Sequence, residues 1–212
     1  GNPAGVSLNG RVIPIESLRH AYHAAEMAQL VRDIPRATIV EVGGGLGGQA
    51  YQTVRIAAGR IAKYVIFDIP EVAAISAFFL LSAFPDKRVR LYGEGPVTVD
   101  PDEAFDIAIF PTFASAQLAD ASVDLFYNSC SFSEMDGQAS REYLSIIERA
   151  GRRYFMHINH DTSLRFSYPD GSISVNVTGS RLVPHPDLFK RIYKKPRVHG
   201  LPEDRSFRYY EY

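Results

Sequence analysis

Hydrophobic positions along the chain follow two periods, one typical of helices and one typical of buried strands. From Ser17 to Val31, apolar residues recur every three or four positions, which predicts a helix with Ser17 as its N-cap. A β-branched run from Thr38 to Val42 predicts a strand, and helical spacing returns over 46–59, where Gly59 is placed to end the helix. The order is therefore helix, strand, glycine-rich turn and helix.

The alternation of short apolar strands with helices continues to about residue 160. Strands are predicted at 64–69, 88–93, 105–113, 122–132 and 152–159, and helices at 70–84 and 138–150. Beyond them we expect a hairpin around Asp170 and Gly171, a segment at 187–195 that is either helix or strand, and a final strand at 206–212.

Strands that are apolar throughout and alternate with helices are typical of a parallel sheet covered on both faces. We therefore predict an α/β fold, a Rossmann-like, doubly wound and mostly parallel seven-stranded sheet with helices on both faces. A length of 212 residues, of which 46% are hydrophobic, fits one domain over 1–212. In this domain, helix 17–31 precedes a Rossmann-like core at 36–212.

Composition narrows the partners and the compartment. A formal net charge of −1 gives no basic footprint for nucleic acid, which favours a small molecule or another protein as partner. Cys130 is the only cysteine, so no intramolecular disulfide can form and we expect a cytoplasmic protein. The apolar stretch at 72–84 is too short to span a bilayer and predicts a buried helix, with 71–84 as a possible contact in a homo-oligomer. Because the chain opens with Gly1 instead of methionine, we expect either a residue left over from cloning or a piece of a longer protein.

The turn from Gly43 to Gly48 holds five glycines in six positions, directly after a predicted strand. In a doubly wound sheet this first turn between strand and helix is the backbone nearest the ligand. Gly43, Gly45 and Gly48 fit the dinucleotide spacing GxGxxG. Glu41 with Gly43, Gly45 and Gly47 fits the spacing ExGxGxG of S-adenosylmethionine enzymes. The glycines alone leave both ligands open.

Two acidic residues beside this turn favour S-adenosylmethionine. Asp68, followed by Ile69, ends the second strand and can accept hydrogen bonds from the ribose hydroxyls of either ligand. Glu41 lies just before the turn, and a dinucleotide has no ammonium group for it to offset. S-adenosylmethionine carries an ammonium group and a sulfonium, whose positive charge an acid in a partly desolvated cleft would attract.

Three stretches, "VEVGGGLGGQAY", "YVIFDIPEV" and "VDLFYNSCSFSEM", resemble the sugar O-methyltransferases, a branch of the class I S-adenosylmethionine-dependent methyltransferases. The resemblance runs from the N-terminal helix to about His160. "FDIPEV" is also similar to the "DLPxV" element of small-molecule O-methyltransferases with this fold. The resemblance implies that the turn, Gly44 included, lines the methionine end and that Asp68 holds the ribose. It also implies that Asn128 and Ser129 border the sulfonium and that a sugar accepts the methyl group.

Methyl transfer to a hydroxyl requires alignment of the two reactants and a base that removes one proton. His160 and Asp161 follow the fifth main strand, where a loop would open onto the cleft, and an unperturbed histidine titrates near neutral pH. A solvated loop histidine is the alternative. Glu134 and Asp136 form a second acidic group that could orient acceptor hydroxyls, assist the base or bind a divalent cation, and Asp136 could instead simply cap the helix that follows. No tight cluster of His, Asp and Glu stands out, so no metal site is predicted.

Two further groups are candidate cofactor contacts. Arg19 and Tyr22, on the N-terminal helix, could close over the cofactor and reach its carboxylate, or Tyr22 could simply pack on the apolar face. Thr112 and Phe113 end a strand beside the expected adenine position, although core packing of Phe113 would give the same pattern.

The sequence therefore predicts an S-adenosylmethionine-dependent O-methyltransferase that acts on a small polar acceptor, such as a sugar. An NAD(P)-dependent oxidoreductase is the leading alternative enzyme, but no Tyr-x-x-x-Lys pair follows the fourth strand. A non-catalytic module that binds S-adenosylmethionine or a nucleotide and acts through a partner is the other alternative.

Overall fold

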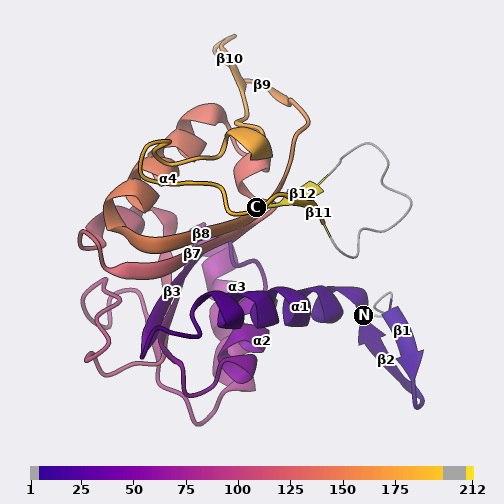
Figure 1. Ribbon diagram of the computed structural model, residues 1–212, viewed down its shortest axis with the longest axis vertical. Coiled ribbons are helices and arrows are strands. Elements are labelled where there is room, and N and C mark those ends of the chain that lie inside the picture. Colours follow the sequence, from indigo (N-terminus) through magenta and orange to yellow (C-terminus); the bar gives the residue numbers. More distant parts are fainter. Residues whose placement is uncertain (1–4, 198–208) are drawn as a thin grey trace.

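The computed structural model describes residues 5–197 and 209–212 and is built around one large, mostly parallel sheet (Figure 1). In spatial order the sheet contains β11 (Lys195–Pro196), β12 (Tyr209–Glu211), β8 (Gly151–His160), β7 (Val123–Ser129), β3 (Ala37–Val42), β4 (Ile61–Asp68), β6 (Ile107–Pro111) and β5 (Val89–Leu91). All pairings from β8 to β5 are parallel, whereas β12 is antiparallel to β8 and β11 is antiparallel to β12. The predicted α/β fold is confirmed. The described part of the chain has eight strands in this sheet where we expected seven, because the two-residue β11 joins its edge.

Helices cover the two faces of the sheet unequally (Figure 1). One face is packed by α1 (Ile15–Leu30), α2 (Gly48–Ile56) and α3 (Pro70–Ala83), and the other by α4 (Gly137–Ala150). Short 3-10 turns lie at η1 (Thr112–Gln117), η2 (Phe132–Glu134) and η3 (Gly179–Arg181). Because β3, β4 and β7 are buried on both faces, alternate side chains enter two separate cores, as expected for parallel strands.

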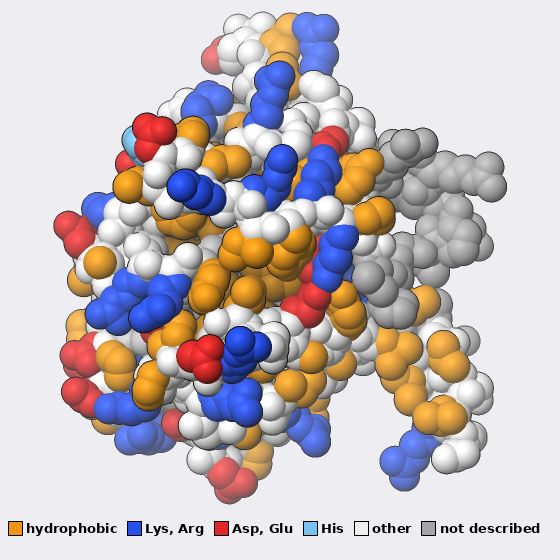
Figure 2. Space-filling view, in the orientation of Figure 1, with side chains coloured by type: hydrophobic (Ala, Val, Ile, Leu, Met, Phe, Trp, Pro, Cys, Tyr) orange, Lys and Arg blue, Asp and Glu red, His pale blue; other side chains and the backbone are white. Residues whose placement is uncertain are grey.

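Two small hairpins lie outside the sheet. The first pairs β1 (Gly5–Leu8) with β2 (Arg11–Pro14) and projects from the body next to the start of α1 (Figure 1). Val6, Leu8 and Val12 of this hairpin are exposed, and Figure 2 shows the hydrophobic surface that the hairpin presents. The second pairs β9 (Arg165–Ser167) with β10 (Ile173–Val175) around Gly171, which has a positive φ of 83°, and confirms the hairpin predicted there.

Three predictions about helices need correction. The first helix begins at Ile15, with Pro14 as N-cap, so Ser17 lies inside it and caps nothing. The second begins at Gly48, which leaves Leu46 in the glycine turn and exposed. The apolar α3 is buried on one side only, because its other side exposes large side chains, including Phe78 at 78%. The uniformly apolar sequence predicted that this segment is a helix, but it did not predict that only one side of the helix is buried.

Toward the C-terminus, the segment at 187–195 is irregular until Lys195 enters β11. The predicted final strand is seen at β12, and its first part, 206–208, lies outside the described residues. Among the described helices, none has both the length and the apolar character needed to cross a membrane.

Candidate functional site

A cleft of about 580 Å³ lies at the carboxyl ends of β3, β4 and β6, on the side of the sheet that α4 covers. This is where open α/β sheets bind their ligands, and the volume is within the usual range of about 300–1,000 Å³ for small-molecule pockets. The lining combines the predicted residues Gly43, Asp68, Ile69, Thr112 and Phe113 with Ser131, Met135 and Tyr143. The five predicted residues span 70 positions in the sequence, from Gly43 to Phe113, and the fold brings them to one site.

The glycine turn enters this cleft with a backbone that other residues adopt with difficulty. Gly43, Gly45 and Gly47 have φ values of 77°, 55° and 82°, in the left-handed region that glycine tolerates. At Gly43 a Cβ atom would lie 2.5 Å from the Ser131 hydroxyl oxygen, whereas at Gly45 it would meet nothing within 4 Å. At these three positions the turn therefore needs glycine for its shape, and at Gly43 also for the close approach of the segment after β7.

Asp68 ties the glycine turn to the end of β4. Its Oδ2 accepts a hydrogen bond of 2.8 Å from the Gly45 amide, and its Oδ1 accepts one of 2.8 Å from the Ile69 amide. Each carboxylate oxygen has a second lone pair, so both can still accept a hydroxyl. Burial raises the pKa of Asp68 above its usual value, and the backbone amides oppose that shift. Asp68 therefore positions the turn as well as facing the cleft.

Phe113 forms one wall of the cleft, and Tyr92, which does not line the cleft itself, packs against it. Phe113 is 63% exposed and meets Tyr92 edge to face, with ring centroids 5.4 Å apart. Exposed aromatic pairs of this kind can stack on a planar ligand ring. On the other wall, burial raises the pKa of Tyr143 to about 12, and the hydroxyl of Thr112 opposes that shift. The Tyr143 hydroxyl is itself buried, so it contributes no exposed polar atom to the cleft.

Sequence reasoning missed Tyr92, Ser131, Met135 and Tyr143. Tyr92 directly follows β5, so the rule that ligands lie beyond the carboxyl ends of parallel strands could have indicated it. Ser131 lies in the "NSCS" stretch that had been singled out for Asn128 and Ser129. Met135 and Tyr143 reach the cleft from the turn before α4 and from α4 itself, and no sequence pattern marks them.

Asn128 supports the site from beneath instead of lining the cleft. It is fully buried, and its amide nitrogen donates to the Val42 carbonyl at 2.9 Å and to the Ser131 hydroxyl. Its Oδ1 accepts a hydrogen bond of 2.8 Å from Asn159. These contacts hold the ends of β3, β7 and β8 together. Ser129 is partly exposed next to Cys130, which has a positive φ of 70°, and it does not line the cleft.

Glu41 lies in the opposite core, away from the cleft. It is 2% exposed and accepts a hydrogen bond of 2.8 Å from the Tyr64 hydroxyl. Burial raises its pKa to about 8, so near pH 7 the carboxyl is mostly protonated and neutral. The expectation that Glu41 offsets a positive charge on a bound ligand is therefore not met by its position, because the alternation of side chains along β3 turns it toward the helices α1 and α2.

The three catalytic candidates separate into two places. Glu134 is exposed and accepts a hydrogen bond of 2.9 Å from the Tyr209 hydroxyl, and the Tyr209 ring meets the His160 ring edge to face at 5.3 Å. His160 is buried at the end of β8, where its Nδ1 accepts from the Thr162 amide at 3.2 Å. Burial lowers its pKa, so the imidazole is neutral near pH 7. Glu134, Tyr209 and His160 therefore form one group, and Tyr209 was not predicted.

Asp161 points elsewhere. Its carboxylate accepts hydrogen bonds from the Ser180 amide at 2.6 Å, from Lys194 at 2.8 Å and from the Tyr212 hydroxyl at 3.1 Å. Burial alone would raise the pKa of Asp161, but Lys194 and Ser180 outweigh it and lower that pKa. The three contacts also fasten η3 and the segment before β11 to the end of β8. The structure thus gives Asp161 a supporting role, in place of the catalytic role predicted from its position after the strand.

Arg19 and Tyr22 are also held away from the cleft. Arg19 pairs with Glu16 on the same helix, and the Tyr22 hydroxyl donates to Glu26 at 2.9 Å and accepts from Lys195 at 2.7 Å. Neither residue lines the cleft. In this structure α1 does not close over the cleft. Arg19 and Tyr22 could therefore contact a cofactor only in a different conformation, in which α1 closes over the cleft.

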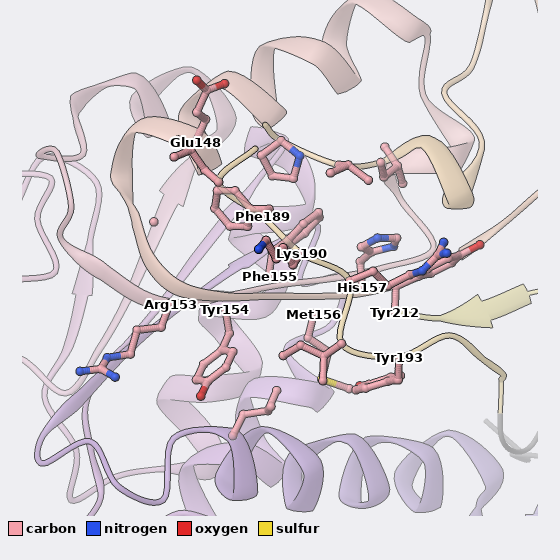
Figure 3. Close-up of a pocket in the computed structure, with 18 of the residues that line it drawn as sticks. Glu148, Arg153, Tyr154, Phe155, Met156, His157, Phe189, Lys190, Tyr193 and Tyr212 are labelled. Atoms are coloured by element: carbon pink, nitrogen blue, oxygen red, sulfur yellow. The ribbon is translucent and has the colours of Figure 1, made fainter. Parts of the chain in front are cut away.

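A second cavity of about 390 Å³ follows β8 (Figure 3). Figure 3 shows Tyr154, Met156 and Tyr193 on the side of β8 that faces α1, and Phe155 and Phe189 on the other side. No residue predicted as a site residue lines this cavity, and it does not lie at the carboxyl ends of the strands, since its lining includes Gly151 at the start of β8. This cavity lies where the C-terminal segment packs against β8, so we assign it no role in the chemistry of the cleft at the strand ends.

Comparison with solved structures places this arrangement among known folds. No protein-family model and no curated protein matches the sequence. Magnesium protoporphyrin IX methyltransferase from Synechocystis PCC 6803, solved with bound SAH, matches with a TM-score of 0.54 at 12% identity over 96% of this chain and 88% of that chain. The same enzyme with bound SAM gives 0.53 at 13% identity over 96% and 85%.

A mitomycin 7-O-methyltransferase structure matches with a TM-score of 0.48 at 16% identity over 74% of this chain, which spans only 39% of the length of that enzyme. At such identities the likeness concerns the fold. The match over nearly the whole chain to the two Synechocystis structures shows that this protein has the fold of the class I S-adenosylmethionine-dependent methyltransferases.

Proposed function

We propose that the protein binds S-adenosylmethionine in the cleft at the ends of β3, β4 and β6 and transfers its methyl group to a hydroxyl of a small polar acceptor, with a sugar as the acceptor class. The observation that carries this proposal is the cleft itself, in which the glycine turn, Asp68 and an exposed aromatic wall meet at the ligand edge of the sheet. The class I fold and the SAM and SAH bound to its structural neighbours support the choice of ligand.

Each part of the cleft suits one part of this ligand. The backbone of the turn, with Gly43, Gly44, Gly45 and Gly47, leaves room for the methionine end, and Asp68 accepts from the ribose hydroxyls. Phe113 with Tyr92, next to Thr112 and Ile69, provides a wall for the adenine ring. Asn128 contributes indirectly, because it fixes Val42 and Ser131 beside Gly43.

When bound, S-adenosylmethionine supplies an activated methyl group, so the protein has to align the acceptor and accept one proton. Glu134 is the exposed member of the group that it forms with Tyr209 and His160, and we propose that it receives the acceptor hydroxyl. His160 lies behind Tyr209, and its neutral imidazole can accept a proton near pH 7. Asp161 has no part in this proposal, because its oxygens are used by other contacts.

Calorimetric titration of the purified protein with S-adenosylhomocysteine, NAD and NADP tests the ligand. We expect S-adenosylhomocysteine alone to bind, and Asp68→Asn to weaken its affinity at least about tenfold, or about 1.4 kcal/mol. Asp102→Asn is the matched control, because Asp102 pairs with Arg36. Arg36 directly precedes β3, so this pair lies at the amino ends of the strands, away from the cleft. Binding of NAD or NADP alone would favour the oxidoreductase, and no binding of any of the three would contradict the proposal.

Activity assays on sugar acceptors separate the enzyme from a non-catalytic binding module. We expect methyl transfer to fall in both Glu134→Gln and His160→Gln while affinity for S-adenosylhomocysteine is retained, because neither residue lines the cleft. Binding without transfer to any acceptor would favour the module, and transfer that neither substitution reduces would contradict the catalytic assignment.

A further inference from the structure

We propose that His23, Glu26 and Glu211 form a binding site for one divalent transition-metal ion, on the face of the sheet opposite the candidate methyl-donor cleft. This site goes beyond the proposed function and does not depend on it. His23 and Glu26 lie three positions apart on α1, whereas Glu211 lies on β12 and is 185 positions or more from both in the sequence. For this reason no sequence cluster indicated a metal.

Three ligand atoms converge in this place. One atom from each of the three residues lies within 4.8 Å of the other two, and His23 Nε2 is 3.6 Å from Glu211 Oε2. Zn²⁺ binds nitrogen and oxygen at about 2.0–2.2 Å, which puts tetrahedral ligand atoms about 3.4 Å apart. The His23 to Glu211 distance already fits that geometry, and a small movement of Glu26 on the helix surface completes it.

These atoms are buried and lack partners. His23 and Glu211 are fully buried, and His23 Nε2, Glu26 Oε2 and Glu211 Oε2 have no hydrogen-bond partner among the described residues. Buried polar atoms are nearly always paired, and carboxylate oxygens are acceptors only. Three such atoms aimed at one point call for a cationic occupant between them, either a metal ion or a proton.

The second ring nitrogen of His23 is held as it is in metal-bound histidines. His23 Nδ1 lies 3.1 Å from the Tyr127 hydroxyl, which donates to Gln49 Oε1 at 3.3 Å. With Tyr127 donating to Gln49, Nδ1–H donates to Tyr127, and the lone pair of Nε2 faces the two carboxylates. A hydrogen bond of this kind fixes the tautomer and ring orientation of histidine ligands.

Lys195 sets the charge of the cluster. Its ammonium group contacts the Oε1 atoms of Glu26 and Glu211, the latter at 3.0 Å, and the Tyr193 hydroxyl donates to the same Glu211 oxygen at 3.1 Å. Figure 3 shows Tyr193 on this side of β8. Lys195 thus balances one of two carboxylate charges and leaves the Oε2 atoms for a second cation. Because like charges repel, it also weakens the binding of that cation.

The donor set selects the class of ion. One imidazole nitrogen and two carboxylate oxygens suit Zn²⁺ or Mn²⁺, whereas Mg²⁺ and Ca²⁺ prefer oxygen alone. The ion would join α1 to β12 at the edge of the sheet and so fix the N-terminal helix against the C-terminal strand. Its role is therefore structural, and stability is the direct readout.

Titration of the tag-free, metal-stripped protein with Zn²⁺, Mn²⁺ and Mg²⁺ tests this proposal. We expect one equivalent of Zn²⁺ or Mn²⁺ to bind and to raise the melting temperature, with no comparable effect of Mg²⁺. With Mn²⁺ bound, pulsed electron paramagnetic resonance should detect one directly coordinated imidazole nitrogen, and His23→Gln should remove that signal.

Variants on the same helix provide the controls. Glu26→Gln and Glu211→Gln should each weaken Zn²⁺ binding at least about tenfold, and Glu16→Gln, which alters an exposed acid on α1 outside the cluster, should leave it unchanged. Lys195→Gln should strengthen binding, because it removes the competing cation. Far-ultraviolet circular dichroism checks that each variant folds. If the variants of the buried residues His23 and Glu211 do not fold, Glu26→Gln still tests the proposal, because Glu26 lies on the helix surface.

Two results would overturn the proposal. One is that neither Zn²⁺ nor Mn²⁺ binds to the wild-type protein with one-to-one stoichiometry, which would mean that the carboxyl groups hold only a shared proton. The other is that Glu26→Gln and Lys195→Gln bind Zn²⁺ as the wild type does, which would place the ion at other surface groups.

Discussion

The backbone of Gly43 combines two demands that only glycine meets. Its φ is positive, and a side chain would collide with Ser131, which Asn128 in turn holds in place. Gly45 has only the first demand, because the space around it is open. The two residues look alike in the sequence and differ only in what the segment after β7 brings beside them.

This difference predicts unequal effects of the same substitution. Gly43→Ala and Gly45→Ala both incur the cost of a left-handed alanine, roughly 1–2 kcal/mol, but Gly43→Ala must also displace Ser131. We expect Gly43→Ala to weaken S-adenosylhomocysteine binding more than Gly45→Ala does, as measured by calorimetry with melting temperatures as a check of folding. Equal affinities of the two variants would contradict the close approach seen in the structure.

At the same scale, the sequence identified cleft residues where the position after a strand determines the contact. Gly43, Asp68 and Phe113 all follow strand ends and all line the cleft. The contacts of Glu41 and Asp161 differ from those expected, for physical reasons. Glu41 faces the other core because side chains alternate along a strand, and Asp161 is captured by Lys194 and Ser180, which are distant in sequence.

Among the elements, α4 has the clearest local cause. Asp136 caps its N-terminus, with Oδ1 accepting from the amides of Gln138 at 2.7 Å and Ala139 at 3.0 Å. The sequence offered this capping role as the alternative to a catalytic one, and the structure confirms the cap. The Tyr168 hydroxyl also donates to Asp136, at 2.9 Å, which ties the β9–β10 hairpin to the same helix end.

Removal of this cap should be costly and specific. We expect Asp136→Ala to lower the free energy of unfolding by about 0.5–2 kcal/mol, and Asp136→Asn, which retains a good capping group, to lower it much less. Denaturant titration followed by circular dichroism measures both. Tyr168→Phe isolates the contribution of the hairpin contact, and a loss in Asp136→Asn equal to that in Asp136→Ala would assign the effect to the carboxylate charge instead of to the cap.

Over the whole molecule, the sequence was sufficient for the alternation of strands and helices, and thus for the fold and the edge of the sheet that holds the cleft. It was not sufficient for contacts between distant segments. The group of Glu134, Tyr209 and His160, and the cluster of His23, Glu26 and Glu211, both depend on β12 lying antiparallel beside β8. No local period encodes that pairing.

The buried carboxyl of Glu41 makes the stability of the whole molecule depend on pH. Its pKa is about 8 in the folded protein against an ordinary value of 4.5, because burial disfavours the charged form. A raised pKa means that the folded state binds the proton more tightly, so this stabilisation is complete below pH 4.5 and is lost as the pH rises through 8. Across that window the loss is up to about 1.4 kcal/mol for each pH unit.

The neutral variant Glu41→Gln isolates this contribution. We expect the wild-type free energy of unfolding to fall more steeply than that of Glu41→Gln between pH 6 and pH 9, as measured by denaturant titration at each pH. Other titrating groups are common to both proteins and cancel in the comparison. Parallel pH profiles would mean that Glu41 is no harder to ionise in the folded state than in the unfolded chain.

The exposed ring of Phe113 at the cleft wall marks a position for a fluorescent reporter of ligand binding. The chain contains no tryptophan. Phe113→Trp would therefore introduce a single indole fluorophore at the rim where an adenine ring would stack, without background emission from any other indole. Ligand entry could then be followed in real time by stopped-flow quenching, with no label attached to the protein or to the small molecule.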